Sequence, residues 1–232
     1  HFASAEKQFR FPLEYANQRP LCTTWTVTGA GAFLLGRESG KKQNYSDNRK
    51  RTDSGSPMIK RAEQEIADDT KQKVCGVRIT GITTGKIVDY GVRDSMNMGA
   101  AMAPAAAACI QAHLKDFSRS PSWYDKIITG DLGKIGQKIL FDLLKDNGID
   151  ISNQHMDCGI EIFDNEEQDT HSGGSGCGCS AITLAGYVLK QLRDGTWKRV
   201  LFVPTGALLS TVSYNEGQNI PGVAHAVIIE RR

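Results

Sequence analysis

The 232-residue chain has no long apolar run, little net charge of either sign and few cysteines. No stretch approaches 18 consecutive apolar residues, so the sequence predicts no membrane-spanning helix. Lys and Arg exceed Asp and Glu by only 28 − 26 = 2, which indicates neither a nucleic-acid partner nor a charged membrane surface. Apolar residues still make up 40% of the chain. The composition is therefore that of a globular protein.

Six cysteines in a chain of this length are too sparse for a disulfide framework. Cys177 and Cys179 are separated by one glycine, a spacing too tight for a comfortable disulfide. We therefore expect reduced thiols in a cytosol-like compartment. The chain opens with His1 and Phe2, without a Met or a charged-then-apolar signal pattern, which we interpret as a processed product or a fragment.

Residues 37–73 differ in composition from the rest of the chain. They hold ten Lys or Arg and seven Asp or Glu, with few large apolar side chains. This composition is typical of a solvated insertion, and Ile59–Thr70 has the pattern of a short charged helix. The alternative is a basic docking loop at Arg49-Lys50-Arg51.

From residue 100 onward the sequence alternates between helical and extended patterns. This alternation predicts an α/β fold with a mostly parallel sheet and helices on its faces, and the last two strands are expected to be antiparallel. Upstream, Thr23–Leu35 is predicted as a buried strand and Val74–Tyr90 as a second β-type run. The elements expected downstream are helices from Pro104 (with the proline in the first turn), at Gly136–Asp146 and from the glycine-rich segment to Arg193, and strands at Tyr124–Thr129, Asp157–Phe163, Lys198–Pro204 and Gly222–Glu230.

The segment His171–Ser180, HSGGSGCGCS, is rich in glycine and precedes an apolar helix. Glycines at a helix start expose backbone N–H groups toward the positive end of the dipole. This pattern predicts a carboxylate or phosphate site at Gly174, Ser175, Gly176 and Cys177. The spacing is that of neither a dinucleotide fingerprint nor a Walker loop. Alternatively, the glycines only allow the helix to pack closely on the sheet.

Cys177 and Cys179 are open to three interpretations. In the first interpretation they are metal ligands together with His171. A zinc-type site would need two more donors beside the two cysteines, and only that histidine is close in sequence. One of them is a nucleophile whose pKa is lowered at the helix start, although no helper histidine has an obvious spacing. Otherwise they are small packing residues at a helix–sheet junction.

Three further residues are candidates for ligand binding at the strand ends. Asp131 directly follows a predicted strand, where open α/β sheets place ligands, or else it stabilises a turn. Gly206 lies in a turn after another strand and borders the same crevice. His225 interrupts an apolar strand, either as a core residue or as a hydrogen-bond donor. The residues themselves predict no metal site and no cofactor.

Several strings are specific enough to indicate a family. The runs GGSGCGCSAITLAGYVLKQL, RVLFVPTGALLS and IPGVAHAVIIE resemble the stage V sporulation protein AD family, as do SAEKQFRFPLEY, TVTGAGAFLL, GKIVDYGVRDSMNMGAAMAPAAA, YDKIITGDLGKIG and MDCGI. The likeness covers nearly the whole chain apart from residues 37–73, which the family lacks. It implies a thiolase-like fold of two βαβαβαββ halves: residues 1–90 are the end of the first half, with the insertion, and residues 91–232 are a complete second half.

The resemblance also implies a function. It implies binding of dipicolinic acid, alone or with calcium, during uptake into the developing spore, and peripheral association with the spore inner membrane beside other proteins of the stage V sporulation A operon. A helix start rich in N–H groups suits one carboxylate of that ligand, and His225 would donate a charge-assisted hydrogen bond. The site expected from the resemblance and the residues together is Asp131, Gly174, Ser175, Gly176, Cys177, Gly206 and His225.

Two departures from condensing enzymes of the thiolase-like fold argue against catalysis. The resemblance places the nucleophilic cysteine in the first half, upstream of His1, and places a histidine where this chain has Gly130-Asp131. Acyl condensation needs a base or proton donor beside the thioester. We therefore expect a non-catalytic binding protein. An acyl-CoA condensing or thiolytic enzyme and a membrane-associated scaffold remain the alternatives.

The truncated first half also bears on assembly. It is expected to leave a large apolar face exposed. The chain is therefore expected to aggregate, or else to pair with the missing segment of the same or another chain, and a homodimer is one such assembly.

Overall fold

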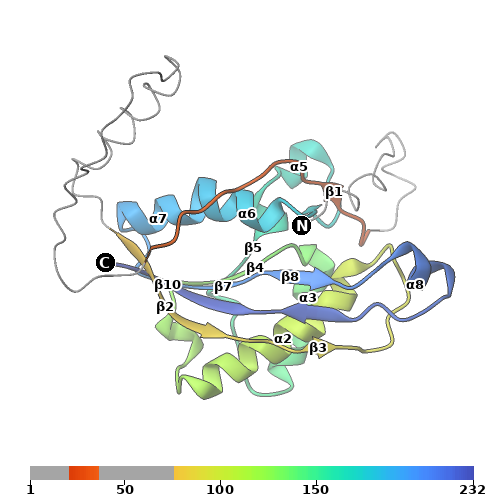
Figure 1. Ribbon diagram of the computed structural model, residues 1–232, viewed down its shortest axis with the longest axis horizontal. Coiled ribbons are helices and arrows are strands. Elements are labelled where there is room, and N and C mark those ends of the chain that lie inside the picture. The colour runs from red at the N-terminus through yellow and green to blue at the C-terminus, as the bar shows by residue number, and fades with distance from the viewer. Residues whose placement is uncertain (1–20, 37–75) are drawn as a thin grey trace, which may run out of the picture.

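Residues 21–36 and 76–232 are described by the computed structural model of the chain (Figure 1). The charged insertion at 37–73, the helix expected at Ile59–Thr70 and the basic segment around Arg49 lie outside the described residues.

A five-stranded mixed sheet forms the centre of the described structure. Its order is β2 (Val77–Thr83), β10 (Ala226–Arg231), β7 (Arg199–Val203), β4 (Lys126–Thr129) and β5 (His155–Asp157). β10 runs antiparallel to both of its neighbours, whereas β4 is parallel to β5 and β7. The α/β class, the mostly parallel sheet and the antiparallel final pair are thus confirmed.

Helices cover both faces of this sheet (Figure 1). One face carries α2 (Met98–Asp116) and α3 (Gly133–Lys145), whose apolar side chains form a core with Ile127, Leu201 and Ile228. The other face carries a continuous helical run of α6 (Cys179–Thr183), a π-helical turn (Leu184–Val188) and α7 (Leu189–Asp194). Its core includes Ile128, Phe202 and Ile229. Alternate residues of the central strands therefore serve opposite cores.

Helix α2 begins earlier than the sequence predicts. The Asn97 side chain accepts a hydrogen bond from the backbone N–H of Ala100 at 3.2 Å, and this cap sets the start at Met98. Pro104 consequently lies buried inside the helix instead of in its first turn, so the prediction of a helix starting at the proline was wrong. The residues before it are mostly Gly, Ala and Met, and they pack closely enough to extend the helix upstream.

Two predicted strands are shorter than expected. In Thr23–Leu35 only β1 (Trp25–Thr26) is extended in a ladder, parallel to β6 (Gly174–Ser175), and Leu34 is fully exposed. The strand expected at Asp157–Phe163 lies instead at His155–Asp157, so the prediction was displaced: Asp157 is the last extended residue, because its side chain caps the helical turn α4 (Cys158–Glu161).

The remaining elements are small. A three-stranded sheet has the order β3 (Ile87–Val88), β9 (Gly222–Ala224) and β8 (Thr205–Ala207). The short helical segments are η3 (Pro121–Trp123), α5 (Asn165–Gln168) and α8 (Thr211–Asn215).

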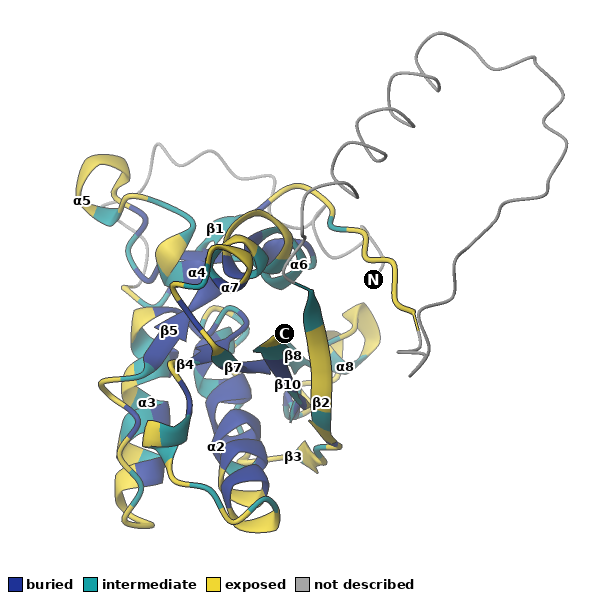
Figure 2. Ribbon diagram, turned by 90° about the vertical axis from the view of Figure 1, so that its left-hand side faces the viewer, coloured by how far each residue is buried: buried dark blue, intermediate teal, exposed yellow. Residues whose placement is uncertain are grey.

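Strand β2 connects the two regions into which the sequence was divided. It lies within residues 1–90, yet it pairs with β10 at the edge of the same sheet as β4, β5 and β7. Figure 2 shows it as a largely exposed strand. The division at residue 90 stays a prediction.

Candidate functional site

The carboxyl ends of three parallel strands meet at one edge of the large sheet. Asp131 follows β4, Asp157 ends β5, and Thr205 follows β7. Ligands of open α/β sheets bind at this edge. The sequence analysis chose Asp131 on this argument, and the structure places it there.

Asp131 is the centre of a cluster of hydrogen bonds. Its Oδ2 accepts from Ser175 Oγ at 2.7 Å and from the Gly176 backbone N–H at 3.1 Å, and its Oδ1 accepts from Thr205 Oγ1 at 3.2 Å. Gly176 has a φ of +141°, a backbone conformation that favours glycine. Three segments that are distant in sequence therefore direct donors at one carboxylate.

Burial dominates the electrostatics of this carboxylate. The pKa of Asp131 is raised to about 6: burial is the largest cause and the neighbouring Asp157 also raises it, whereas the hydrogen bonds from Gly176, Ser175 and Thr205 lower it. The residue is half-buried. Asp131 is thus a carboxyl group that changes charge within a mildly acidic range.

Asp157 forms a second cluster beneath the first. It is 1% exposed, and burial raises its pKa. Its carboxylate accepts hydrogen bonds from the Thr129 hydroxyl at 2.6 Å and from four backbone N–H groups. Those four belong to Leu132, Gly133, Gly159 and Ile160, at 2.9 to 3.3 Å. Asp157 therefore fixes both the turn that carries Asp131 and the start of α4.

A buried histidine completes this second cluster. His155 Nε2 lies 3.0 Å from Thr129 Oγ1, and Gln137 Nε2 lies 2.9 Å from His155 Nδ1. One arrangement satisfies both contacts: Gln137 donates to Nδ1, and Nε2–H donates to Thr129, which donates to Asp157. Burial lowers the pKa of His155 to about 4, so the ring is neutral near neutral pH and suits this arrangement.

The structure brings only some of the predicted site residues together. Ser175 and Gly176 bind Asp131, and Gly206 is the next residue after Thr205 in β8. Gly174 is a packing residue: a Cβ there would lie 2.7 Å from Val27 and 2.8 Å from Ile162. Cys177 is half-buried in the same turn.

His225 forms its hydrogen bond with a residue outside the Asp131 cluster. It is the exposed residue between β9 and β10, and its Nδ1 accepts a hydrogen bond from the Gly85 backbone N–H at 3.0 Å. The prediction of a core position was therefore wrong, because the strand bends at this residue. Its neighbour Ala224 is paired with Thr205, so the bend lies close to the cluster along the ladder.

Two of the described thiols are deeply buried in the protein. Cys158 and Cys179 are fully buried, and burial raises both pKa values, as expected for inert structural cysteines. No disulfide joins the cysteines that the structure describes. Within residues 21–36 and 76–232, no group of three or more His, Cys, Asp or Glu is arranged to hold a metal ion.

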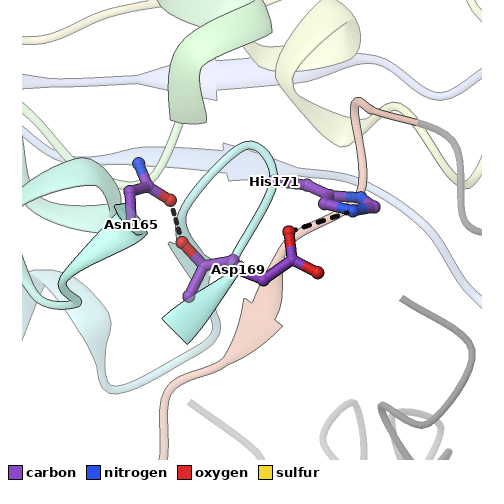
Figure 3. A network of polar contacts seen from close by, with 4 residues as sticks. Asn165, Asp169 and His171 are labelled. Atoms are coloured by element: carbon purple, nitrogen blue, oxygen red, sulfur yellow. Dashed lines mark hydrogen bonds and ion pairs between the residues drawn. The ribbon is translucent and has the colours of Figure 1, made fainter. Parts of the chain in front are cut away.

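His171 lies in the loop that leads into the glycine-rich turn (Figure 3). Its Nε2 lies 3.5 Å from Asp169 Oδ1, and its side chain is 8% exposed. Its Nδ1 is buried without a hydrogen-bond partner. In the same loop the Thr170 hydroxyl donates to Asn165 Oδ1. The contact that the structure gives His171 is thus to Asp169, within its own loop.

Neither Thr205 nor the Asp157 cluster was predicted from the sequence. Asp157 is a carboxylate at the end of a strand, a signal close to that of Asp131, but the strand was predicted to begin at Asp157 instead of ending there. Two hollows of the described surface lie outside both clusters. One, of about 620 Å³, is lined by Asp89, Arg93 and Asn219 among others, and the second, of about 350 Å³, by Ile182, Gly186 and Tyr187 among others.

Solved structures with a partly similar fold have low sequence identity to this chain. An acetyl-CoA acetyltransferase from Bacillus anthracis matches with a TM-score of 0.39 and 16% identity, over 73% of this chain and 34% of that protein. The 3-oxoacyl-[acyl-carrier-protein] synthase III from Aquifex aeolicus VF5 matches with a TM-score of 0.37 and 15% identity, over 68% of this chain and 54% of that protein.

Comparisons of the sequence give higher identity and cover more of the chain than these structural matches. A family model described as Stage V sporulation protein AD (SpoVAD) matches residues 1–230. The protein of that name from Bacillus subtilis (strain 168) is 39% identical over 231 residues, which is 100% of this chain and 58% of the relative. This chain thus spans little more than half the length of that relative. It belongs to the Stage V sporulation protein AD family.

Proposed function

We propose that this sporulation protein binds dipicolinic acid, alone or with calcium, without catalysing a reaction on it, and so serves its uptake into the developing spore. The observation that carries the proposal is the convergence of Ser175, Gly176 and Thr205 on a carboxylate at the ligand-binding edge of the sheet. A set of donors that accommodates one carboxylate has the chemistry to accept another. Dipicolinate is a flat aromatic dicarboxylate, and one of its carboxylates would use these donors.

Calorimetry with dipicolinate on the full chain tests this function. Replacing Ser175 by Ala removes one hydroxyl donor and is expected to weaken binding about five- to thirtyfold, because a hydrogen bond to a charged group contributes about 1–2 kcal/mol. Ser122→Ala is the matched control, because Ser122 is exposed in η3 at the opposite ends of the strands. No measurable heat with the wild-type chain at about pH 5.5 or at about pH 7.5, with or without calcium, would rule out the function.

The enzymatic alternative makes a different prediction. Acyl transfer by a thiol needs an accessible, activated cysteine, whereas Cys158 and Cys179 are buried and their pKa values are raised by burial. Incubation with an acyl-CoA thioester followed by intact-mass measurement is expected to show no added acyl group. A stoichiometric acyl adduct would favour the enzyme.

The place of action is also part of the proposal. We propose that the protein acts on the cytoplasmic side of the spore inner membrane, beside other proteins of the stage V sporulation A operon. Among the described residues no helix is long and apolar enough to cross a bilayer. Co-sedimentation of the chain with spore inner-membrane vesicles tests this location, and recovery in the supernatant alone would contradict it.

A further inference from the structure

The donors of the candidate site are already occupied by a residue of the protein itself. Ser175 Oγ and the Gly176 N–H both donate to Asp131 Oδ2, and Thr205 Oγ1 donates to Oδ1. The distances of 2.7 to 3.2 Å are those of formed hydrogen bonds. A hydroxyl has a single proton to donate, so Ser175 and Thr205 cannot serve Asp131 and a ligand carboxylate at the same time.

Charge adds to this competition. An ionised Asp131 beside a ligand carboxylate places two negative groups within a few ångströms, in surroundings that also contain Asp157. Like charges at such a distance repel by several kcal/mol at the effective dielectric constant of a protein. The ionised side chain therefore opposes a carboxylate ligand both by holding its donors and by repelling it.

We propose that Asp131 is a built-in occupant of the carboxylate position, so that a ligand carboxylate binds to Ser175, Gly176 and Thr205 only when Asp131 is neutral or has turned away. This inference rests on the proposed function and adds its regulation.

Protonation is the simplest way to neutralise the occupant. Three titratable groups interact electrostatically with Asp131: Asp157 at the end of β5, Cys158 in α4 and Cys179 in α6. All three are buried. The pKa of Asp131, raised to about 6 by burial, places its loss of charge where dipicolinate is still a dianion. Binding of dipicolinate is therefore expected to tighten as the pH falls through about 6.

Substitution of Asp131 by Asn tests the inference. Asparagine keeps the shape, its oxygen accepts from Ser175 or Gly176, and its amide donates to Thr205, whose hydroxyl is also an acceptor. The variant has no charge and holds the donors more weakly. We expect dipicolinate to bind at least about tenfold more tightly to Asp131→Asn at about pH 7.5, with affinity that no longer changes between about pH 5.5 and about pH 7.5.

A matched control and the possible outcomes keep the two proposals separate. Asp142→Asn removes one exposed negative charge from α3 and is expected to leave affinity unchanged, and a thermal melt of each variant checks that it folds. If the wild-type chain binds dipicolinate and Asp131→Asn binds equally or more weakly, the inference is wrong and the binding function stands. If neither protein binds at any pH, the proposed function fails, and the inference fails with it.

Discussion

Asp131 and Asp157 show how the same residue type at equivalent positions takes different roles. Both lie at the carboxyl ends of parallel strands, but Asp131 is half-buried and bound mostly by side chains of other segments. Asp157 is buried and bound by four backbone N–H groups and one hydroxyl. Asp157 cannot release its backbone N–H donors unless the turns that carry them unfold. Asp157 is therefore structural, whereas Asp131 is free to exchange partners.

Replacement of Asp157 by Asn is expected to destabilise the fold by about 2–4 kcal/mol. The amide group presents N–H donors to backbone N–H groups, and several buried donors lose their acceptor. Chemical denaturation monitored by circular dichroism measures the change. Asp150→Asn is the control, because Asp150 is exposed and accepts from the Ser152 N–H at 2.9 Å, and a loss of less than about 1 kcal/mol is expected there. Equal losses in the two variants would contradict the structural role of Asp157.

At the scale of elements, two glycines set how closely α2 and α3 pack. A Cβ added at Gly136 would lie 2.9 Å from the Cα of Gly99, and one added at Gly99 would lie 3.0 Å from the Cα of Gly136. The obstructing atoms belong to the backbone, which cannot move aside as a flexible side chain would. The helices therefore cross at a distance that only glycine allows at both positions.

Gly136→Ala is expected to lower the free energy of unfolding by about 1–3 kcal/mol, because the added methyl group overpacks this crossing. Gly186→Ala is the matched control: Gly186 is exposed in the π-helical turn, and a Cβ there meets nothing within 4 Å. That variant is expected to keep the stability or raise it by up to about 1 kcal/mol. Thermal melts of both variants measure these changes in stability. A Gly136→Ala protein as stable as the unmodified chain would contradict the close crossing of the two helices.

The sequence predicted the elements better than their ends. Alternating strands and helices after residue 100 were visible because strands such as Arg199–Val203 are mostly apolar and others, such as Lys126–Thr129, are followed directly by glycine. The start of α2 was missed because the cap at Asn97 is a single polar residue. The long strand expected at Thr23–Leu35 was wrong because β-branched composition does not supply a ladder partner, and only two residues found one.

Part of the candidate site was predictable from the sequence, because local patterns mark some of its residues. Asp131 comes just after a predicted strand, and Ser175 and Gly176 lie in a glycine-rich segment before a predicted helix, which are local signals; in the structure that helix, α6, begins at Cys179. Thr205 had no local signal, because its role depends on the parallel pairing of β4 with β7. His225 was misjudged because nothing in its apolar surroundings in the sequence shows that the chain bends between β9 and β10.

For the whole molecule, exposed apolar side chains bear on its assembly. Leu34 is 101% exposed, Leu35 76% and Ile82 on the edge strand β2 64%. Exposed apolar side chains and an unpaired strand edge favour association. The isolated chain is therefore expected to form dimers or larger species at micromolar concentration in sedimentation velocity. A single monomeric species with a sharp thermal transition would contradict this prediction.

The binding claim is tested most directly by recording amide ¹⁵N–¹H spectra of the labelled full chain while dipicolinate is added at about pH 6. We predict a saturable shift of the Gly176 amide, because its N–H would exchange Asp131 for a ligand carboxylate, together with little change at Asn219 in the hollow that Asp89 and Arg93 also line. Shifts at Asn219 with none at Gly176, or no shift at all, would contradict the account.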